Sequence, residues 1–297
     1  MRPGIVSHAT SGAALRATRR TALTVMIAAQ AFMLHYQCAV AAPIDESRAL
    51  FVRAQAAIKT GQAQQARQLI DKLQHYPLTG YLELSLTLRQ LAFTEHETVA
   101  AVMRKHGELP AAFMLRRPWL RKLAHEGRWQ LLLEHHIEND DTISACLAAQ
   151  AKWQLDDLEQ AWRDARRLWL TGHSLPDLCD PMIAAWRAAG QLSELLVWKR
   201  VKLAMENNQV KLALYLRRYA GDRYAVLIDR WISLRGEPSR LPLLATGADV
   251  ASEDRATMLI DVFKRTTTRD VAVARAILKK LAAKQLPDSV MAVLRDQ

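Results

Sequence analysis

Two histidine motifs are the first places in this sequence where residue types and spacing could support metal chemistry. His96 and Glu97 begin like the zinc-protease helix H-E-x-x-H, in which two histidines four residues apart bind zinc and the glutamate is the general base. Ala100 occupies the position of the second histidine. We therefore predict no zinc-protease site at this motif.

The second motif, His135 and His136, is followed by the acidic residues Glu138, Asp140 and Asp141. Adjacent histidines project from different faces of a helix, and acidic residues behind them are typical of a solvated turn. The sequence also contains no glycine-rich phosphate loop and no G-x-S-x-G nucleophile elbow. We therefore assign no metal site, no cofactor and no catalytic residue.

Tryptophan is the next candidate for chemistry, because its flat faces suit the apolar faces of sugar rings. The alternative is that tryptophans at helical spacing fill the core between helices. We favour the core interpretation for the eight tryptophans, which are Trp119, Trp129, Trp153, Trp162, Trp169, Trp186, Trp198 and Trp231.

Basic residues cluster in several segments. Most of them fit the solvated faces of amphipathic helices, but any that line one concave surface would attract a polyanion. The clusters are Arg116, Arg117, Arg121 and Lys122; Arg163, Arg166 and Arg167; Lys199, Arg200 and Lys202; and Arg217 and Arg218.

The elements that must position these residues are short amphipathic helices from Glu46 onward, such as Thr142 to Gln154, and no segment alternates with period two over the length of a strand. One such helix places five residues on one broad face for burial: Ala161, Trp162, Ala165, Leu168 and Trp169. Gly172 beyond it could cap the helix in the left-handed conformation. Helices of about 10 to 18 residues bury a face only by stacking. We predict an all-α fold, an irregular α-superhelix (solenoid) of antiparallel helix hairpins, without an internal domain boundary.

The N-terminus has the layout of a signal peptide. Arg19 and Arg20 precede an apolar stretch from Thr21 to Val40, and Ala39 and Ala41 supply the small residues of an A-x-A cleavage site. We predict a signal peptide over residues 1–41 and a helical domain over residues 42–297, with no membrane span after cleavage. The alternatives are an uncleaved anchor and a lipoprotein.

Export changes the partners that a basic chain is expected to meet. The full chain of 297 residues has 41 basic and 30 acidic residues; residues 1–41 hold four arginines and no acid, which leaves a net charge of +7 after cleavage. A basic surface usually indicates nucleic acid, but an exported protein encounters acidic wall polymers instead. We predict no nucleic-acid partner.

Cys146 and Cys179 are the cysteines that remain after cleavage. An even pair in an oxidising compartment tends to form a disulfide. We predict a disulfide between them; two separate buried thiols are the alternative.

Residues 151–190, together with segments on either side, resemble soluble lytic murein transglycosylases. The resemblance extends from about Glu46 to Met205 and is weaker beyond. The residues that carry it are Tyr76-Pro77-Leu78, Tyr81-Leu82-Glu83, Ala151-Lys152-Trp153, Glu159-Gln160-Ala161-Trp162, Leu168-Trp169-Leu170-Thr171-Gly172, Cys179-Asp180, Trp186-Arg187-Ala188 and Lys202-Leu203-Ala204-Met205.

The resemblance implies a periplasmic protein in which a U-shaped helical region carries a C-terminal lysozyme-like domain. In the family, that domain cleaves the bond between N-acetylmuramic acid and N-acetylglucosamine through one glutamate, with a 1,6-anhydro product. The family's cysteine pair matches Cys146 and Cys179. This sequence departs from the family pattern because it lacks the Gly-Leu-Met-Gln and Ala-Tyr-Asn elements, and its sole Glu-Ser pair is Glu46-Ser47. We expect the catalytic domain to be absent and carry over no catalytic residue.

These observations predict a periplasmic protein of lytic-transglycosylase type that acts as a superhelical scaffold and binds peptidoglycan. Its expected partners are peptidoglycan, a separately encoded catalytic chain and other cell-wall enzymes. The alternative is a periplasmic α-solenoid that binds proteins and has no role with glycan.

Overall fold

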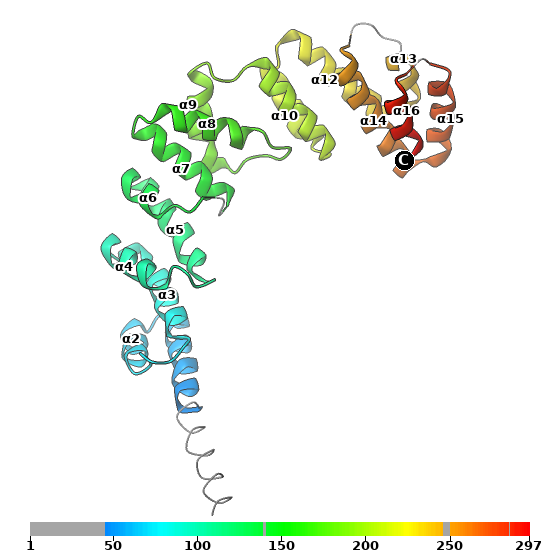
Figure 1. The fold of residues 1–297 in the computed structure, drawn as a ribbon. Helices are drawn as coiled ribbons and strands as arrows, with labels where there is room; N and C mark the ends of the chain where they lie inside the picture. Colours follow the sequence, from blue (N-terminus) through cyan, green and yellow to red (C-terminus); the bar gives the residue numbers. More distant parts are fainter. Residues whose placement is uncertain (1–44, 139–140, 246–249, 285) are drawn as a thin grey trace, which may run out of the picture. The chain divides into compact units, whose positions relative to one another are not determined.

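The computed structural model describes residues 45–138, 141–245, 250–284 and 286–297. The predicted signal peptide over residues 1–41 and Asp140 of the second histidine motif lie outside these residues. Within the described ranges every regular element is helical (Figure 1), which confirms the all-α class. Among the same residues, no helix is both long enough and apolar enough to cross a bilayer.

Residues 45–59 are helical, and the later α-helices follow in short steps. They are α2 (Ala63–Asp71), α3 (Thr79–Arg89), α4 (His96–His106), α5 (Ala112–His125), α6 (Trp129–His135), α7 (Thr142–Gln154), α8 (Leu158–Trp169), α9 (Asp180–Ala188), α10 (Glu194–Glu206), α11 (Val210–Leu216), α12 (Gly221–Gly236), α13 (Leu241–Ala245), α14 (Ser252–Arg269), α15 (Val271–Ala282) and α16 (Asp288–Arg295). Single 3-10 turns lie between some of them: η1 (Leu91–Phe93), η2 (Asp177–Cys179), η3 (Arg217–Tyr219) and η4 (Pro238–Arg240).

The chain divides into two compact units, Met1–Trp119 and Leu120–Gln297, each with its own core. In the first unit, small and branched apolar side chains from residues 45–59, α2 and α3 pack together: Ala54, Ala57, Ile58, Ala66, Leu69, Ile70, Leu73, Leu82 and Leu86. In the second unit a larger cluster runs through α7 to α16 and includes Trp169, Trp186, Trp198 and Trp231.

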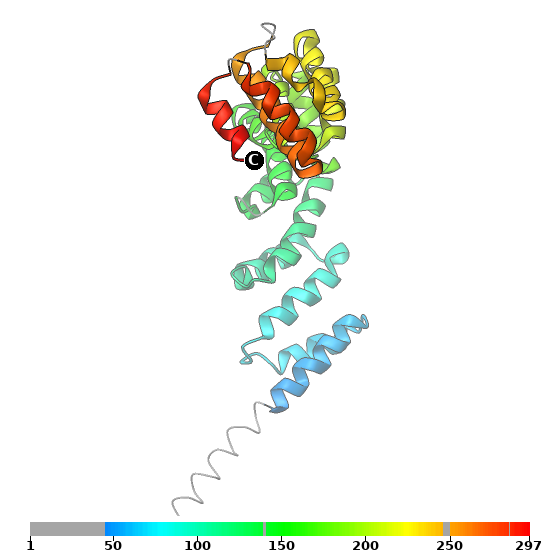
Figure 2. The ribbon, with the colours of Figure 1, turned by 90° about the vertical axis from the view of Figure 1, so that its right-hand side faces the viewer.

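Two of the helix hairpins turn at a polar residue that ends the first helix, so that the next helix can pack against it. Asp156 between α7 and α8, and Asn208 between α10 and α11, adopt the left-handed conformation with φ of 65° and 60°. Asp and Asn tolerate this conformation better than most other side chains. The paired helices α7 and α8 lie against each other, as do α10 and α11 (Figures 1 and 2).

The α8 face predicted from the sequence is confirmed. Ala161, Ala165 and Trp169 are buried, and Trp162 and Leu168 are half-buried against the same core. Arg163 and Arg166 on the other side are exposed. The predicted role of Gly172 is wrong, because this glycine is not among the positive-φ residues. Its lack of a side chain instead allows the loop after α8 to lie close to α10. A Cβ at Gly172 would lie 2.5 Å from the backbone oxygen of Leu203 on α10.

Candidate functional site

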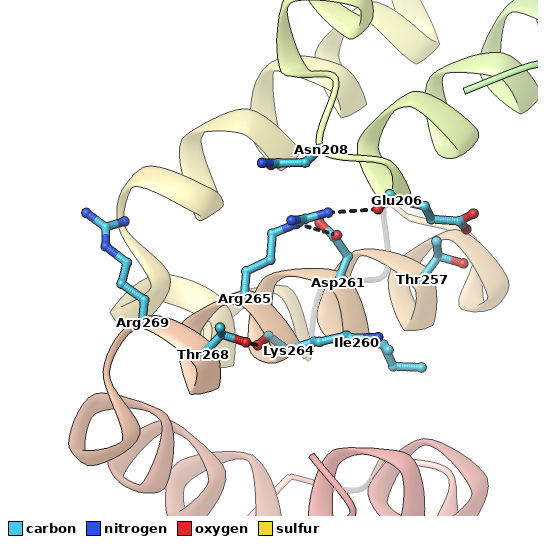
Figure 3. A pocket seen from close by; sticks show the side chains of 9 residues that line it. All are labelled: Glu206, Asn208, Thr257, Ile260, Asp261, Lys264, Arg265, Thr268 and Arg269. Carbon is cyan, nitrogen blue, oxygen red and sulfur yellow. Dashed lines mark hydrogen bonds and ion pairs between the residues drawn. The ribbon is translucent and has the colours of Figure 1, made fainter. Parts of the chain in front are cut away.

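A groove of about 860 Å³ opens on the second unit (Figure 3). Its floor is one face of α14, and two further residues come from the α10–α11 turn. The residues on α14 recur every three or four positions, as required for one helical face. The groove is lined by Glu206, Asn208, Thr257, Ile260, Asp261, Lys264, Arg265, Thr268 and Arg269.

Asp261 at the floor is a buried carboxylate whose lone pairs are occupied. Oδ2 accepts hydrogen bonds from Trp231 Nε1 at 2.7 Å and from Arg235 Nε at 2.8 Å. Oδ1 accepts from Arg235 Nη2 at 2.8 Å and from Arg265 Nε at 2.9 Å. A carboxylate held by four donors has no free position from which to transfer a proton to a ligand, so Asp261 is a structural anchor.

The two arginines bound to Asp261 also hold the end of α10. Arg265 Nη2 donates to the backbone oxygens of Met205 and Glu206, both at 2.9 Å, and Arg235 Nη2 also donates to Met205. These carbonyls lie at the negative end of the helix dipole, where a guanidinium is favoured. Burial lowers the pKa of Arg235, and hydrogen bonding to Asp261 opposes this effect. The network therefore fixes the turn that presents Asn208 to the groove.

The rim of the groove contains two cationic side chains that, unlike Arg235 and Arg265, are not paired with a carboxylate of the described residues. Lys264 and Arg269 are exposed, and no salt bridge joins either of them to a carboxylate within the described residues. Figure 3 shows Arg269 at the opposite end of the groove from Glu206. The hydroxyl of Thr257 lies at the Glu206 end, and the hydroxyl of Thr268 and the amide of Asn208 lie between the two ends. This arrangement suits a ligand with carboxylates, hydroxyls and amides.

A second network repeats the first one along α14. Trp198 Nε1 donates to Asp254 Oδ1 at 2.8 Å, and Lys202 Nζ lies 3.3 Å from the same oxygen. Lys202 also contacts Glu253 at 3.2 Å. Burial lowers the pKa of Lys202, but the hydrogen bonds and charges of Glu253 and Asp254 outweigh it and raise the pKa. Thus Trp198 with Lys202, and Trp231 with Arg235, each bind one carboxylate of α14. The members of each pair are four residues apart, and the two carboxylates are seven residues apart.

The predicted disulfide between Cys146 and Cys179 is present in the structure, with a Cα–Cα distance of 5.1 Å. It joins α7 to the 3-10 turn η2 that leads into α9. The tryptophans behave as core residues: Trp119, Trp169, Trp186, Trp198 and Trp231 are buried, and Trp129, Trp153 and Trp162 are half-buried.

The histidine motifs hold structural contacts. Trp119 Nε1 donates to Nδ1 of His96 at 3.2 Å. Asp141 caps α7, accepting from the backbone nitrogens of Ile143 at 2.8 Å and Ser144 at 3.1 Å. No three His, Cys, Asp or Glu side chains in the described part of the chain lie close enough to hold a metal ion.

Sequence reasoning missed the carboxylates of α14 and misjudged two arginines. Arg116 and Arg200 belong to basic clusters predicted to be mostly solvated, yet they are only 8% and 4% exposed. The signal for the α14 anchors was present in the spacing of Trp198 with Lys202, of Trp231 with Arg235, and of Asp254 with Asp261. Spacing within each helix could not reveal which helices would meet.

Comparison with known proteins identifies relatives over most of the chain. It is 31% identical over 257 residues to the soluble lytic murein transglycosylase of Escherichia coli K12, which covers 85% of this chain and 39% of that protein. The Salmonella typhimurium protein of the same name is 29% identical over 276 residues, covering 91% and 42%. The chain thus spans about two fifths of the length of these curated relatives.

Solved structures agree with the sequence relatives. The crystal structure of the 70 kDa soluble lytic transglycosylase from Escherichia coli matches with a TM-score of 0.73 at 29% identity, over 85% of this chain and 41% of that one. A complex of this 70 kDa transglycosylase with bulgecin A gives the same TM-score at 30% identity and the same coverage. An inactive mutant of lytic transglycosylase Slt from Pseudomonas aeruginosa matches at a TM-score of 0.67 and 25% identity, over 82% and 40%.

A family model described as cucumovirus coat protein matches residues 115–229. This match covers less than half of the chain and disagrees with the transglycosylase relatives, which cover 85–91% of it. It carries no functional conclusion, because the transglycosylase similarity extends further in sequence and is matched in the arrangement of the helices. Sequence and fold together show that this chain is related, over 85–91% of its length, to soluble lytic murein transglycosylases.

Proposed function

We propose that residues 42–297 are a peptidoglycan-binding helical region of a lytic-transglycosylase-type protein in the periplasm, exported by a cleaved signal peptide over residues 1–41. The names of the relatives support murein, the wall polymer itself, as the ligand. Peptidoglycan offers carboxylates, hydroxyls and acetamido groups together. These are the groups that the groove on α14 is equipped to bind.

One observation carries the proposal. Arg235 and Arg265 each form an ion pair with Asp261, whereas Lys264 and Arg269 at the rim have no ion pair with a carboxylate of the described residues. Cations that no carboxylate of the protein neutralises attract an anionic ligand, and more strongly at low ionic strength. A cationic rim around a polar groove therefore favours an acidic wall glycan as the occupant.

Glycan cleavage is outside the role proposed for these residues. The carboxylate of Asp261 is fully engaged, and the Gly-Leu-Met-Gln and Ala-Tyr-Asn elements of the family do not occur in residues 1–297. In this proposal a lysozyme-like domain, in the same polypeptide or as a separately encoded chain, does the cutting. Incubation of purified residues 42–297 with murein sacculi should release no 1,6-anhydromuropeptides; substantial release would contradict this part of the proposal.

Co-sedimentation with purified sacculi tests binding. Residues 42–297 should sediment with sacculi, and the double variant Lys264→Gln/Arg269→Gln should bind about tenfold more weakly, as expected for the loss of two charge-assisted contacts. The matched control is Lys279→Gln/Lys280→Gln on α15, which removes the same charge from exposed positions away from the groove. A pure protein-binding scaffold would leave the wild-type chain in the supernatant.

A further inference from the structure

A pair of tyrosines, one near the end of α11 and one in the following turn η3, forms an aromatic surface that the groove does not include. The rings of Tyr215 and Tyr219 contact each other edge to face, with centroids 5.9 Å apart and an angle of 71° between their planes. Their hydroxyl oxygens are 3.4 Å apart. Tyr215 is 48% exposed and Tyr219 is half-buried, so the ring of Tyr215 is available to a ligand.

Two arginines stack on these rings. The guanidinium carbon of Arg218 lies 4.4 Å from the centroid of Tyr215, and that of Arg187 on α9 lies 4.8 Å from the centroid of Tyr219. Both distances are within the range of cation–π attraction. The Arg218 Nε also donates to the backbone oxygen of Tyr215 at 3.1 Å. The arginines are thus held in place by aromatic rings and a carbonyl.

Neither stacked arginine has a carboxylate partner among the described residues, and the neighbouring residue shows the contrast. Arg217 donates to both oxygens of Asp229 at 2.7 Å, a bidentate ion pair. Arg218, one residue later, forms no salt bridge with the acids described. Asp180 interacts electrostatically with the phenol of Tyr215 and pairs with none of the arginines of the cluster.

A third arginine, which interacts electrostatically with Tyr215, adds positive charge near this surface. Arg200 on α10 is 4% exposed, stacks 4.2 Å from the Trp169 centroid and donates through Nη2 to the backbone oxygen of His173 at 3.2 Å. Its buried Nε has no acceptor within the described residues. Burial lowers the pKa of Arg200 to about 10, and its interaction with Tyr215 opposes that effect. At neutral pH it remains a cation without a counter-ion among the residues that the structure describes.

We propose that Tyr215, Tyr219, Arg187 and Arg218 form a binding site for a pyranose that bears a carboxylate. An exposed tyrosine face packs against the apolar face of a sugar ring, and a guanidinium fork receives a carboxylate through two parallel hydrogen bonds. The identity of the sugar rests on the proposed function: of the two amino sugars of peptidoglycan, only the muramyl residue has a lactyl group, and its carboxylate is free on glycan from which the stem peptide has been removed.

The test compares two soluble disaccharides that differ in the lactyl group that bears the carboxylate, N-acetylglucosaminyl-N-acetylmuramic acid and N,N′-diacetylchitobiose, called chitobiose below. Binding to residues 42–297 is measured by calorimetry or by NMR. The wild-type chain should bind the muramyl disaccharide about tenfold more tightly than chitobiose. Arg218→Gln should abolish that preference, and Tyr215→Ala should weaken binding of both sugars. Arg217→Gln is the matched control and should change neither affinity, since this arginine is engaged by Asp229.

Each contrary result is informative, and circular dichroism verifies that the surface variants are folded. Equal affinity for the two sugars, or equal effects of the Arg217 and Arg218 substitutions, would overturn the site. Binding of poly-L-glutamate as tight as that of the muramyl sugar and insensitive to Tyr215→Ala would do the same. Wild-type sedimentation with sacculi without any disaccharide binding would overturn this site and leave the proposed function intact. Disaccharide binding without sedimentation would overturn the proposed function and leave this site intact.

Discussion

Trp231 donates its indole N–H to the carboxylate of Asp261, with 2.7 Å between Nε1 and Oδ2. Trp198 makes the equivalent contact with Asp254 at 2.8 Å, one heptad earlier on α14. The rings of Trp198 and Trp231 pack edge to face, with their centroids 5.9 Å apart. Large apolar rings therefore form the core of the second unit while their polar edges fix the helix that bears the groove.

Removing the carboxylate at position 261 should strongly destabilise the fold. In Asp261→Asn the buried guanidinium of Arg235, whose side chain is 10% exposed, loses its counter-ion. Loss of one partner from a buried ion pair costs roughly 3 to 5 kcal/mol. Urea unfolding of residues 42–297 measures this cost. Asp229→Asn, which breaks a pair about half exposed on both sides, is the control and should leave the urea midpoint nearly unchanged; equal shifts in both variants would contradict the network.

Gly172→Ala should destabilise the packing of the loop after α8 against α10. The new methyl group would meet the carbonyl oxygen of Leu203, a backbone atom that cannot rotate away. Overpacking of this kind costs about 1 to 3 kcal/mol, measurable as a lower melting temperature. Gly236→Ala at the end of α12 is the matched control, because no neighbouring atom lies within 4 Å of the place that its methyl group would take. A neutral Gly172→Ala would show that the two segments are less closely packed than described.

Loss of the disulfide should lower stability through the unfolded state. Cys146 and Cys179 are separated by 33 positions, and closing a loop of that size is worth roughly 3.5 to 4 kcal/mol in the chain-entropy model. The double variant Cys146→Ala/Cys179→Ala should melt at a lower temperature than the oxidised wild type. Adding a reductant should lower the wild-type value and leave the variant unchanged. An identical melting temperature for oxidised wild type and variant would contradict a stabilising bridge.

Acid should weaken the first unit through Glu83. Burial raises the pKa of this carboxyl, but hydrogen bonds and charges from Lys105 and His106 outweigh burial and lower the pKa below its ordinary value of 4.5. A carboxyl with a lowered pKa in the folded state stabilises the fold above the pKa of the unfolded chain and loses that contribution as pH falls through the folded value. Stability should therefore decline below about pH 4.5.

Glu83→Gln isolates that effect. The variant should be less stable than wild type at neutral pH, and the difference should shrink as pH is lowered below 4.5. Chemical unfolding at a series of pH values gives both quantities. A difference that stays constant across the acid range would show that Glu83 acts through packing and not through its charge.

The helices and much of the core could be predicted from sequence, because both depend on local spacing. Both ends of α7, Thr142 and Gln154, agree with the predicted range. The buried face of α8 follows from the recurrence of Ala161, Ala165 and Trp169. A disulfide between Cys146 and Cys179 followed from the export signal and an even cysteine count.

The candidate sites could not be predicted, because they depend on which helices meet. Asp261 is unremarkable on its own helix, and its role exists only where Trp231 and Arg235 of α12 reach it. Arg217 and Arg218 are adjacent and of the same residue type. They differ because Asp229 of α12 lies within reach of Arg217, whereas Arg218 stacks on Tyr215. Gly172 was interpreted as a cap, since nothing local indicates the approach of Leu203.

Co-sedimentation of residues 42–297 with murein sacculi at low and high salt tests the central claim most directly. The account predicts that the wild-type chain sediments with sacculi, that salt weakens this binding, and that Lys264→Gln/Arg269→Gln reduces it while Lys279→Gln/Lys280→Gln does not. A wild-type chain that remains in the supernatant at low salt would contradict peptidoglycan binding and favour a protein-binding scaffold.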